Sequence, residues 1–341
     1  MRIGLIGWYG HSNAGDERIL YCLRRFFDGH DLLVTSSFGD ASARIEELNS
    51  CDFVILGGGG LILRGTGQFA AIVERLKPRF GCVGISVEAR HADNVRIIQV
   101  LKARAEFILV RDARSRELLD CHFKTIVGPD LTFLYPFEVA APVESDVCGV
   151  NLRPWRFWPG EHNGAFDRLM RRLNHGATDL ERLYPFAKWN QEKVVNILRR
   201  SFKTVSPISL YLEDGVKNDR DVLSTFFPEA PAEFAPEHFH ACRYIVGMRL
   251  HALIFACQTA IPFLSLSYQP KNEEFCKALG MPGLSLDIFR PALLAEAIDN
   301  LKSEYARIRL GLLDIRAEYR QEIRAVMTAI RRLVTRVGQE C

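Results

Sequence analysis

Strand-like apolar runs alternate with helix-like segments along most of this chain, and this alternation constrains the fold more strongly than any other feature of the sequence. In the first half, strands are predicted at Arg2–Gly7, Asp31–Thr35, Phe53–Leu56, Cys82–Ser86, Phe107–Val110 and Thr125–Val127. Helices are predicted between them at Ala14–Phe27, Ser42–Asn49, Gln68–Leu76, Val95–Ala103 and Ala113–Asp120. This alternation is typical of βαβ units, which build a parallel sheet covered by helices. We therefore expect a doubly wound, Rossmann-like first domain.

A change in composition divides the chain. From Pro136 to Ser145 the sequence is rich in proline and glutamate and lacks periodicity, and a new strand is expected at Val147–Leu152. The second half repeats the alternation, with strands at Thr204–Tyr211, Tyr244–Val246 and Phe263–Leu266 and helices at Phe166–Leu173, Gln191–Phe202, Asp219–Phe227, Ala235–Ala241, Leu250–Gln258 and Asn272–Leu279. We expect two Rossmann-like α/β domains, residues 1–140 and 146–290, that face a cleft in the GT-B-like plan.

The remaining residues, 291–341, are expected to form a helical tail that packs on the domains. Apolar residues recur there at helical spacing: Ile308, Leu312, Ile315, Tyr319 and Ile323. A second interpretation is that a basic face of this tail touches an anionic membrane surface, through Arg324, Arg331, Arg332 and Arg336. Packing is favoured, because most charged helix faces are simply solvated.

Composition narrows the class of protein. The 341 residues are 48% apolar and 25% charged, which is ordinary for a globular protein. The longest apolar stretch, Tyr244–Tyr268, contains Arg249 and His251, so a membrane span is not expected. The N-terminus enters a strand directly, without the apolar core of a signal peptide, and the nine cysteines form no C-x-x-C pair. We expect a cytoplasmic protein with reduced thiols and no metal or other cofactor.

Charge argues against one class of partner. The net charge is +3, and lysines and arginines are dispersed along the chain. A nucleic-acid-binding protein concentrates its basic residues on one face, so nucleic acid is not expected as a partner. Anionic small molecules fit this charge distribution better.

Two glycine-rich segments follow strands of the first half. Residues 7–17, which include Asn13, Gly15 and Asp16, form a turn before a helix, where free backbone N–H groups attract anions. An equally favoured interpretation is a tight turn in which Asn13 and Asp16 cap the helix. Gly57–Gly60 follow the third strand, and Gly58, Gly59 and Gly60 predict a backbone surface that a ligand can approach, in preference to a plain flexible loop.

Two arginines stand at the carboxyl ends of predicted strands. Arg111 precedes Asp112, and here we favour a helix cap by Asp112 and an ion pair of Arg111 over a ligand role. Arg153 follows the first strand of the second half and suits bidentate binding of phosphate or carboxylate. For Arg153, a binding role and a plain surface position are about equally supported.

The most informative segment runs from Gly247 to Ala252, between a strand and an apolar helix. Arg249, the backbone of Leu250 and His251 converge there on a helix N-terminus, which gives three sources of affinity for an anion. A binding role is favoured over a structural histidine. Lys271, just past the next strand, adds a cation that can face the same cleft.

Together these segments resemble the polysaccharide pyruvyl transferase family. The match follows the family pattern in order through residues 7–20, 57–61, 110–115, Asp130, 150–155, 247–256 and 267–271. The resemblance implies a GT-B-like fold and the transfer of pyruvate from phosphoenolpyruvate to two hydroxyls of a hexose, with a cyclic ketal and phosphate as products. It implies that Arg153, Arg249, Leu250 and His251 bind phosphoenolpyruvate, and that the acceptor is a nucleotide-linked or lipid-linked sugar of a cell-envelope or exopolysaccharide precursor.

The reaction needs a proton delivered to the methylene carbon, and a residue that titrates near neutrality suits this step. His251 is the candidate, with Asp16 as a partner, and the sequence does not decide which is acid and which is base. Residues 61–67 and 85–88 depart from the family pattern. Both segments lie in the first domain, which the resemblance implies is the acceptor side, with the second domain as the phosphoenolpyruvate side, so the acceptor or the activity can differ. A metal-independent glycosyltransferase that uses a nucleotide sugar, or a non-catalytic sugar-binding subunit of an envelope assembly complex, are the alternatives.

Overall fold

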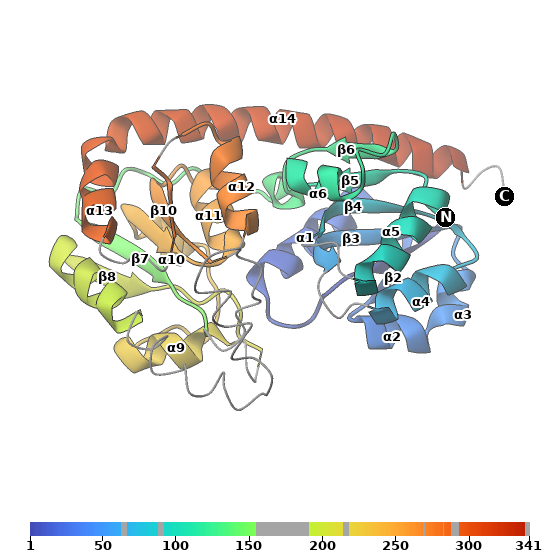
Figure 1. Cartoon of the computed structure of the whole chain (residues 1–341), viewed down its shortest axis with the longest axis horizontal. Helices are drawn as coiled ribbons and strands as arrows, with labels where there is room; N and C mark the ends of the chain where they lie inside the picture. Colours follow the sequence, from blue (N-terminus) through green and yellow to red (C-terminus); the bar gives the residue numbers. More distant parts are fainter. Residues whose placement is uncertain are drawn as a thin grey trace. The chain divides into compact units, whose positions relative to one another are not determined.

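The computed structural model describes residues 1–62, 67–87, 92–154, 191–213, 218–268, 270–281, 283–287 and 293–337. Their contacts form two compact units, one of Met1–Pro136 with Arg316–Cys341 and one of Phe137–Ile315. Each unit is a parallel sheet with helices packed on it, so the predicted α/β, GT-B-like fold class is confirmed (Figure 1). The three-part division predicted from the sequence stays a prediction.

The sheet of unit 1 has six parallel strands. In spatial order they are β2 (Asp31–Thr35), β1 (Arg2–Ile6), β3 (Phe53–Ile62), β4 (Arg79–Val87), β5 (Ile108–Val110) and β6 (Thr125–Val127). The chain runs from β1 outward to β2 and then returns to the other side of β1 to form β3. The strand order therefore reverses between β1 and β3, where Ile6 lies opposite Leu56.

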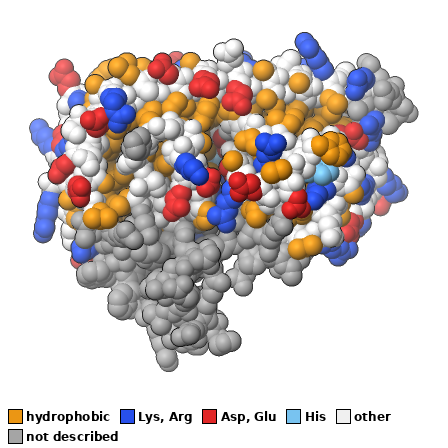
Figure 2. All heavy atoms as spheres, turned by 45° about the horizontal axis from the view of Figure 1, so that its top comes forward, with side chains coloured by type: hydrophobic (Ala, Val, Ile, Leu, Met, Phe, Trp, Pro, Cys, Tyr) orange, Lys and Arg blue, Asp and Glu red, His pale blue; other side chains and the backbone are white. Residues whose placement is uncertain are grey.

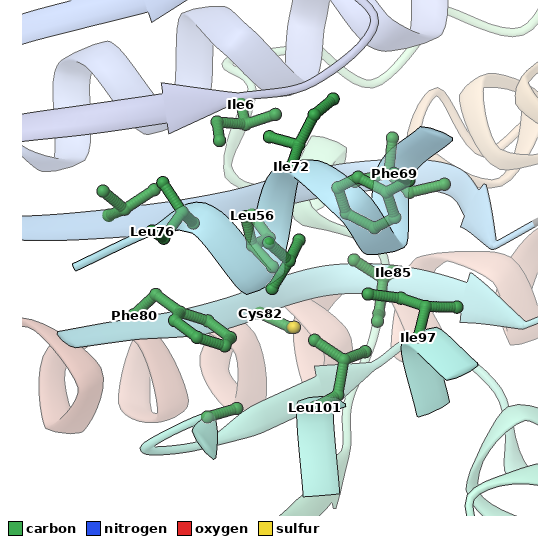
Figure 3. Close-up of a cluster of buried hydrophobic side chains, with 14 of the residues drawn as sticks. Ile6, Leu56, Phe69, Ile72, Leu76, Phe80, Cys82, Ile85, Ile97 and Leu101 are labelled. Carbon is green, nitrogen blue, oxygen red and sulfur yellow. The ribbon is translucent and has the colours of Figure 1, made fainter. Parts of the chain in front are cut away.

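Helices bury apolar side chains against this sheet. They are α1 (Ala14–Phe26), α2 (Phe38–Ala43), α3 (Ile45–Asn49), α4 (Gly67–Arg75), α5 (Ala92–Arg104) and α6 (Ala113–Leu118), with a short 3₁₀ helix η1 at Leu131–Leu134. Side chains of α4 and α5, such as Phe69 and Leu101, meet Leu56 and Cys82 from the sheet in one buried cluster (Figure 3). Burial of this apolar surface holds the helices on the sheet.

Among the strands of unit 1, β3 differs most from its prediction. The sequence predicts that the third strand ends at Leu56, but β3 continues to Ile62 and pairs with β4 through the glycines, as in Gly57 opposite Val83 and Gly59 opposite Ile85. Its pairing with β1 ends at Leu56. Backbone pairing with β4 therefore keeps the glycines in the sheet even though glycine is intrinsically unfavourable in a strand.

The sheet of unit 2 has five parallel strands. In spatial order they are β11 (Ser285–Asp287), β10 (Phe263–Ser267), β9 (Tyr244–Gly247), β7 (Val147–Asn151) and β8 (Thr204–Pro207). The helices are α9 (Asp219–Phe226), α10 (Glu237–His240), α11 (Leu250–Gln258), α12 (Pro270–Ala278) and α13 (Leu294–Ser303), and residues 191–201 are also helical. The strand order reverses between β7 and β9.

Two details of unit 2 differ from the sequence prediction. β8 ends at Pro207 rather than Tyr211: the N–H of Ile208 still donates to the carbonyl of Val150 at 2.8 Å, and residues 208–210 then leave regular structure. The short edge strand β11 was not predicted, since three residues show too little alternation to be recognised. The helix expected at Phe166–Leu173 lies outside the described residues.

The helix α14 (Tyr305–Val337) forms most of the C-terminal tail. Its apolar positions Ile308, Leu312, Ile323 and Met327 are buried, and the Tyr319 ring packs against Phe133 with centroids 5.2 Å apart. The predicted C-terminal helical tail is therefore confirmed. On the face drawn in Figure 2, Lys and Arg side chains are interspersed with Asp and Glu. Among the described residues, no helix combines the length and apolarity needed to span a bilayer.

Candidate functional site

Each unit has one position where ligands of open α/β sheets bind, the crevice outside the carboxyl ends of the strands at the point where the strand order reverses. In unit 1 this switch point lies beyond β1 and β3, and in unit 2 it lies beyond β7 and β9. The residues predicted for a site follow these strands or, for the glycines, lie in the part of β3 that extends past its pairing with β1. Asn13, Gly15, Asp16 and Gly58–Gly60 belong to the first switch point, and Arg153 and Arg249–His251 to the second, with Lys271 after the neighbouring strand β10.

At the first switch point, Asn13 caps α1. Its side-chain oxygen accepts a hydrogen bond from the backbone N–H of Gly15 at 3.2 Å, and its amide donates to a carboxylate oxygen of Asp16 at 2.5 Å. Glu17 accepts bonds from the N–H groups of Gly10 and His11, at 2.7 and 3.2 Å. The capping interpretation of Asn13 is confirmed. The same network fixes the Asp16 carboxylate at the edge of the sheet.

The glycines of β3 have a packing reason to be glycine. A β-carbon on Gly58 would lie 2.2 Å from Cγ2 of Ile19, and one on Gly59 would lie 2.7 Å from Oδ1 of Asp16. Both residues also have positive φ angles, 65° and 83°, which favour glycine. Close contact with α1 thus accounts for Gly58 and Gly59. A ligand role for these two and for the half-buried Gly60 stays a prediction.

Arg111 takes part in a buried ion pair. Its NH1 donates to Asp130 at 2.9 Å and its Nε to the hydroxyl of Ser86 at 2.7 Å, with only 5% and 4% of the two charged side chains exposed. Asp112 caps α6 by accepting from the N–H of Ser115 at 2.6 Å. The predicted cap and ion pair are both confirmed, so these charges act within the fold of unit 1.

At the second switch point, Arg249 is fixed by two buried polar residues. Its backbone N–H donates to Oδ1 of Asn151 at 3.0 Å, and its Nε donates to both carboxylate oxygens of Asp219 at 2.7 and 2.8 Å. Asp219 is fully buried and also accepts from the Asn151 amide and from the N–H groups of Leu210 and Tyr211. Burial opposes the charge of Arg249, but Asp219 more than compensates and raises the pKa of the guanidinium above its usual value.

Arg153 has a different partner. Its NH1 donates to the hydroxyl of Tyr268 at 2.6 Å, and its guanidinium carbon lies 4.7 Å from the centre of the Tyr268 ring. Gln191 donates to the backbone carbonyl of Arg153 at 2.9 Å. Burial raises the pKa of Tyr268, but Arg153, Lys271 and Arg249 together lower it below the usual tyrosine value. Three cations therefore act on one buried phenol.

His251 and Leu250 lie in the first turn of α11, and Arg249 occupies the N-cap position. The backbone N–H groups of this turn give the helix N-terminus its affinity for anions. The half-buried imidazole of His251 lies over Phe255, with ring centroids 5.7 Å apart. The arrangement offers two guanidinium groups, an ammonium group, an imidazole and a helix N-terminus at one sheet edge, which suits a small ligand with two anionic groups.

The sequence missed three residues that organise this second switch point. Asn151, Asp219 and Tyr268 were not among the predicted site residues, although Asn151 and Tyr268 lie within segments that match the family pattern. Asp219 is 30 residues from Arg249, so only the fold shows that the two meet. Within the described parts of the chain, no three His, Cys, Asp or Glu side chains gather in a way that could hold a metal ion.

Comparison with known proteins identifies the relatives of this chain. The model of the polysaccharide pyruvyl transferase family matches residues 13–270. Among solved structures, HepE of Anabaena in complex with UDP is similar with a TM-score of 0.59 and 10% identity over 98% of this chain and 100% of that one. The UDP-GlcNAc 2-epimerase of Neisseria meningitidis bound to UDP-GlcNAc is similar with a TM-score of 0.55 and 13% identity, over 92% and 94%. At such low identity, these structures establish only a shared fold.

Proposed function

We propose, because this chain belongs to the polysaccharide pyruvyl transferase family, that this transferase takes pyruvate from phosphoenolpyruvate and attaches it to two hydroxyls of a hexose. The hexose belongs to a nucleotide-linked or lipid-linked precursor of a cell-envelope polysaccharide or exopolysaccharide. The products are a cyclic ketal and phosphate. The reaction would take place in the cytoplasm, at or near the inner face of the membrane.

The observation that supports the donor most directly is the pair of arginines at the switch point of unit 2. Phosphoenolpyruvate carries a phosphate and a carboxylate, and a guanidinium group binds either of them through two parallel hydrogen bonds. Arg153 and Arg249 come from two adjacent strands, β7 and β9, and Lys271 follows β10. We assign one anionic group of the donor to each arginine, with the N–H of Leu250 as a further donor of hydrogen bonds.

The chemistry follows from the donor. A proton is added to the methylene carbon, which becomes a methyl group and leaves an oxocarbenium-like centre at the neighbouring carbon. A sugar hydroxyl attacks this carbon and loses its proton, the bond to phosphate breaks, and the second hydroxyl closes the ketal as its proton is released. We assign proton transfer at the donor to His251 and propose Asp16 as the acid–base residue of unit 1, because its carboxylate is held at that sheet edge.

A glycosyltransferase that uses a nucleotide sugar is the second candidate. The structures of HepE and of the Neisseria epimerase contain UDP and UDP-GlcNAc, and they share this fold. In this alternative, Arg249 and His251 would hold a nucleotide diphosphate. Fold alone does not assign a substrate, so the two candidates must be separated by ligand.

Thermal unfolding measured with phosphoenolpyruvate, inorganic phosphate, pyruvate or UDP separates them. A ligand that binds only the folded protein raises its melting temperature, and we expect the largest rise with phosphoenolpyruvate. Arg249→Ala alone would leave the buried Asp219 carboxylate without its cation, so we use the double variant Arg249→Ala/Asp219→Asn. Arg220→Ala, which removes an exposed arginine of α9, is the matched control.

We expect phosphoenolpyruvate to stabilise the native protein and the Arg220→Ala control but not the double variant. Phosphate release from phosphoenolpyruvate that depends on an added sugar acceptor would then establish the transfer. Stabilisation by UDP with none by phosphoenolpyruvate would contradict the proposal and favour the glycosyltransferase.

A further inference from the structure

We propose that Tyr268 is a positioning residue of the anion-binding site in unit 2, whose ring and hydroxyl hold the guanidinium of Arg153 in place for the donor. This inference rests on the proposed function, because it gives Tyr268 a role in binding the donor. Neither the predicted site residues nor the family match assigns any role to this tyrosine.

The geometry fixes Arg153 in two ways. The hydroxyl of Tyr268 accepts a 2.6 Å hydrogen bond from NH1, and the aromatic ring lies beside the guanidinium, 4.7 Å from its central carbon. The first contact sets the direction of the guanidinium group, and the second sets its distance from the ring. Only 8% of Arg153 and 3% of Tyr268 are exposed, so little water competes for these contacts.

The contact also joins strands that are not neighbours. Arg153 follows β7 and Tyr268 follows β10, while β9 lies between these strands in the sheet. The side chains therefore meet across the carboxyl end of β9, where Arg249 begins the turn into α11. Tyr268 thus connects Arg153 to the same sheet edge that carries Arg249 and Lys271.

The charges around Tyr268 give this role a measurable signature. Burial disfavours its phenolate, but Arg153 after β7, Arg249 at the start of α11 and Lys271 on α12 favour it more, and the pKa is lowered. A phenolate would neutralise one positive charge of the site and compete with the donor for Arg153. Above the pKa of Tyr268, binding of an anion must therefore take up a proton, and the dissociation constant rises by up to tenfold per pH unit.

The test measures the dissociation constant of phosphoenolpyruvate by calorimetry between about pH 7 and 10, for the native protein, Tyr268→Phe and Lys271→Arg. In the native protein we expect affinity to fall steeply at alkaline pH. Tyr268→Phe keeps the ring but loses the hydroxyl, so we expect about five- to tenfold weaker binding at pH 7 and no alkaline fall from this phenol. Lys271→Arg keeps a cation that does not titrate in this range and should retain the fall, which separates the tyrosine from the lysine.

A second measurement needs no variant. Absorbance near 295 nm follows tyrosine ionisation, and saturating phosphoenolpyruvate should move one tyrosine of the native protein to a higher titration midpoint. Equal affinities for Tyr268→Phe and the native protein at every pH, or a titration that the ligand leaves unchanged, would overturn the proposal.

UDP, used as a second anion probe, separates this inference from the proposed function. If UDP binds with the same Tyr268-dependent pH profile and phosphoenolpyruvate does not bind, the role of Tyr268 stands and the pyruvyl donor is wrong. If neither anion binds the native protein, both proposals fail.

Discussion

The two switch points share a topology and differ in charge. In unit 1 the strand order reverses between β1 and β3, and the sheet edge at this switch point carries Asp16 and Glu17. In unit 2 the strand order reverses between β7 and β9, and the sheet edge at this switch point carries Arg153 and Arg249. Strand order thus selects the place where a ligand can bind, and the side chains that follow the strands select its chemistry.

Each unit contains a buried tyrosine, and the pKa values of the two tyrosines shift in opposite directions. Tyr9 of unit 1 donates its hydroxyl proton to the carbonyl of Gly57 at 2.8 Å, and burial raises its pKa, with further increases from Asp16 and Glu17. Tyr268 of unit 2 is equally buried, yet its cationic neighbours lower its pKa. In unit 1 the carboxylates thus add to burial in keeping a phenol protonated, whereas in unit 2 the cations outweigh burial and favour an anion, as the proposed binding of the donor in unit 2 requires.

The largest expected effect comes from the two buried carboxylates that hold arginines, Asp219 in unit 2 and Asp130 in unit 1. Changing either to alanine leaves a buried guanidinium without its partner, and we expect each variant to lose about 3–5 kcal/mol of unfolding free energy. Only Asp219→Ala should also weaken phosphoenolpyruvate binding, because it releases Arg249. Chemical denaturation measures the unfolding free energy. Calorimetry under conditions in which the variant is folded measures the binding of phosphoenolpyruvate.

Asp130→Ala serves as the control for general destabilisation in that comparison. If it weakened donor binding as much as Asp219→Ala, the assignment of the donor to unit 2 alone would be wrong. If Asp219→Ala bound the donor normally, Arg249 would not need its ion pair to act.

The next effect comes from the glycines of β3. Gly58→Ala would place a β-carbon 2.2 Å from Ile19 and impose a side chain at a φ of 65°, so we expect a loss of roughly 3 kcal/mol from overpacking and backbone strain together. Gly29→Ala is the matched control, because Gly29 has a φ of 87° but nothing within 4 Å of the added carbon. It should lose only about 1 kcal/mol. If Gly58→Ala and Gly29→Ala lost equal unfolding free energy in denaturant, the close contact between α1 and β3 would not be what requires glycine at position 58.

The sequence predicted most strands and helices because their alternation depends on local apolar patterns. It could not predict that β3 runs through Gly57–Gly60, since glycine has low strand propensity and only the pairing with β4 keeps it in the sheet. β8 was predicted too long for a different reason: the apolar residues after Pro207 are buried, as in a strand, but do not belong to one.

The candidate site was predicted in part. Arg153, Arg249, His251 and Lys271 were proposed because charged residues at the ends of apolar strands stand out in the sequence, and their role in binding stays a prediction. Asp219 was assigned only to the start of a helix, and its bonds to Arg249 depend on how α9 meets the sheet. Long-range partners of this kind leave no local pattern, and for that reason the sequence indicated the proposed binding residues but not the residues that hold them in place.

The smallest expected effect sharpens the comparison of the two tyrosines. Tyr9→Phe removes the hydrogen bond to Gly57, and we expect a loss of about 1 kcal/mol at neutral pH. The folded-state pKa of Tyr9 lies above its unfolded value near 10, so the native protein loses this group's contribution as pH rises above 10, when the unfolded chain ionises and the folded one does not. Phenylalanine has no proton to lose, so the stability difference should shrink and then reverse in denaturant unfolding above pH 10.

Tyr21→Phe, on a more exposed face of α1, should change stability little at either pH. Adding Asp16→Asn should leave the pH of the reversal unchanged, because the reversal begins when the unfolded chain ionises and burial alone keeps the folded-state pKa of Tyr9 well above that pH. A delayed reversal in Asp16→Asn would show that the Asp16 carboxylate, rather than burial, keeps the folded-state pKa of Tyr9 high. With an unchanged reversal, burial suffices to explain Tyr9, and the contrast between the two tyrosines rests mainly on the cations around Tyr268.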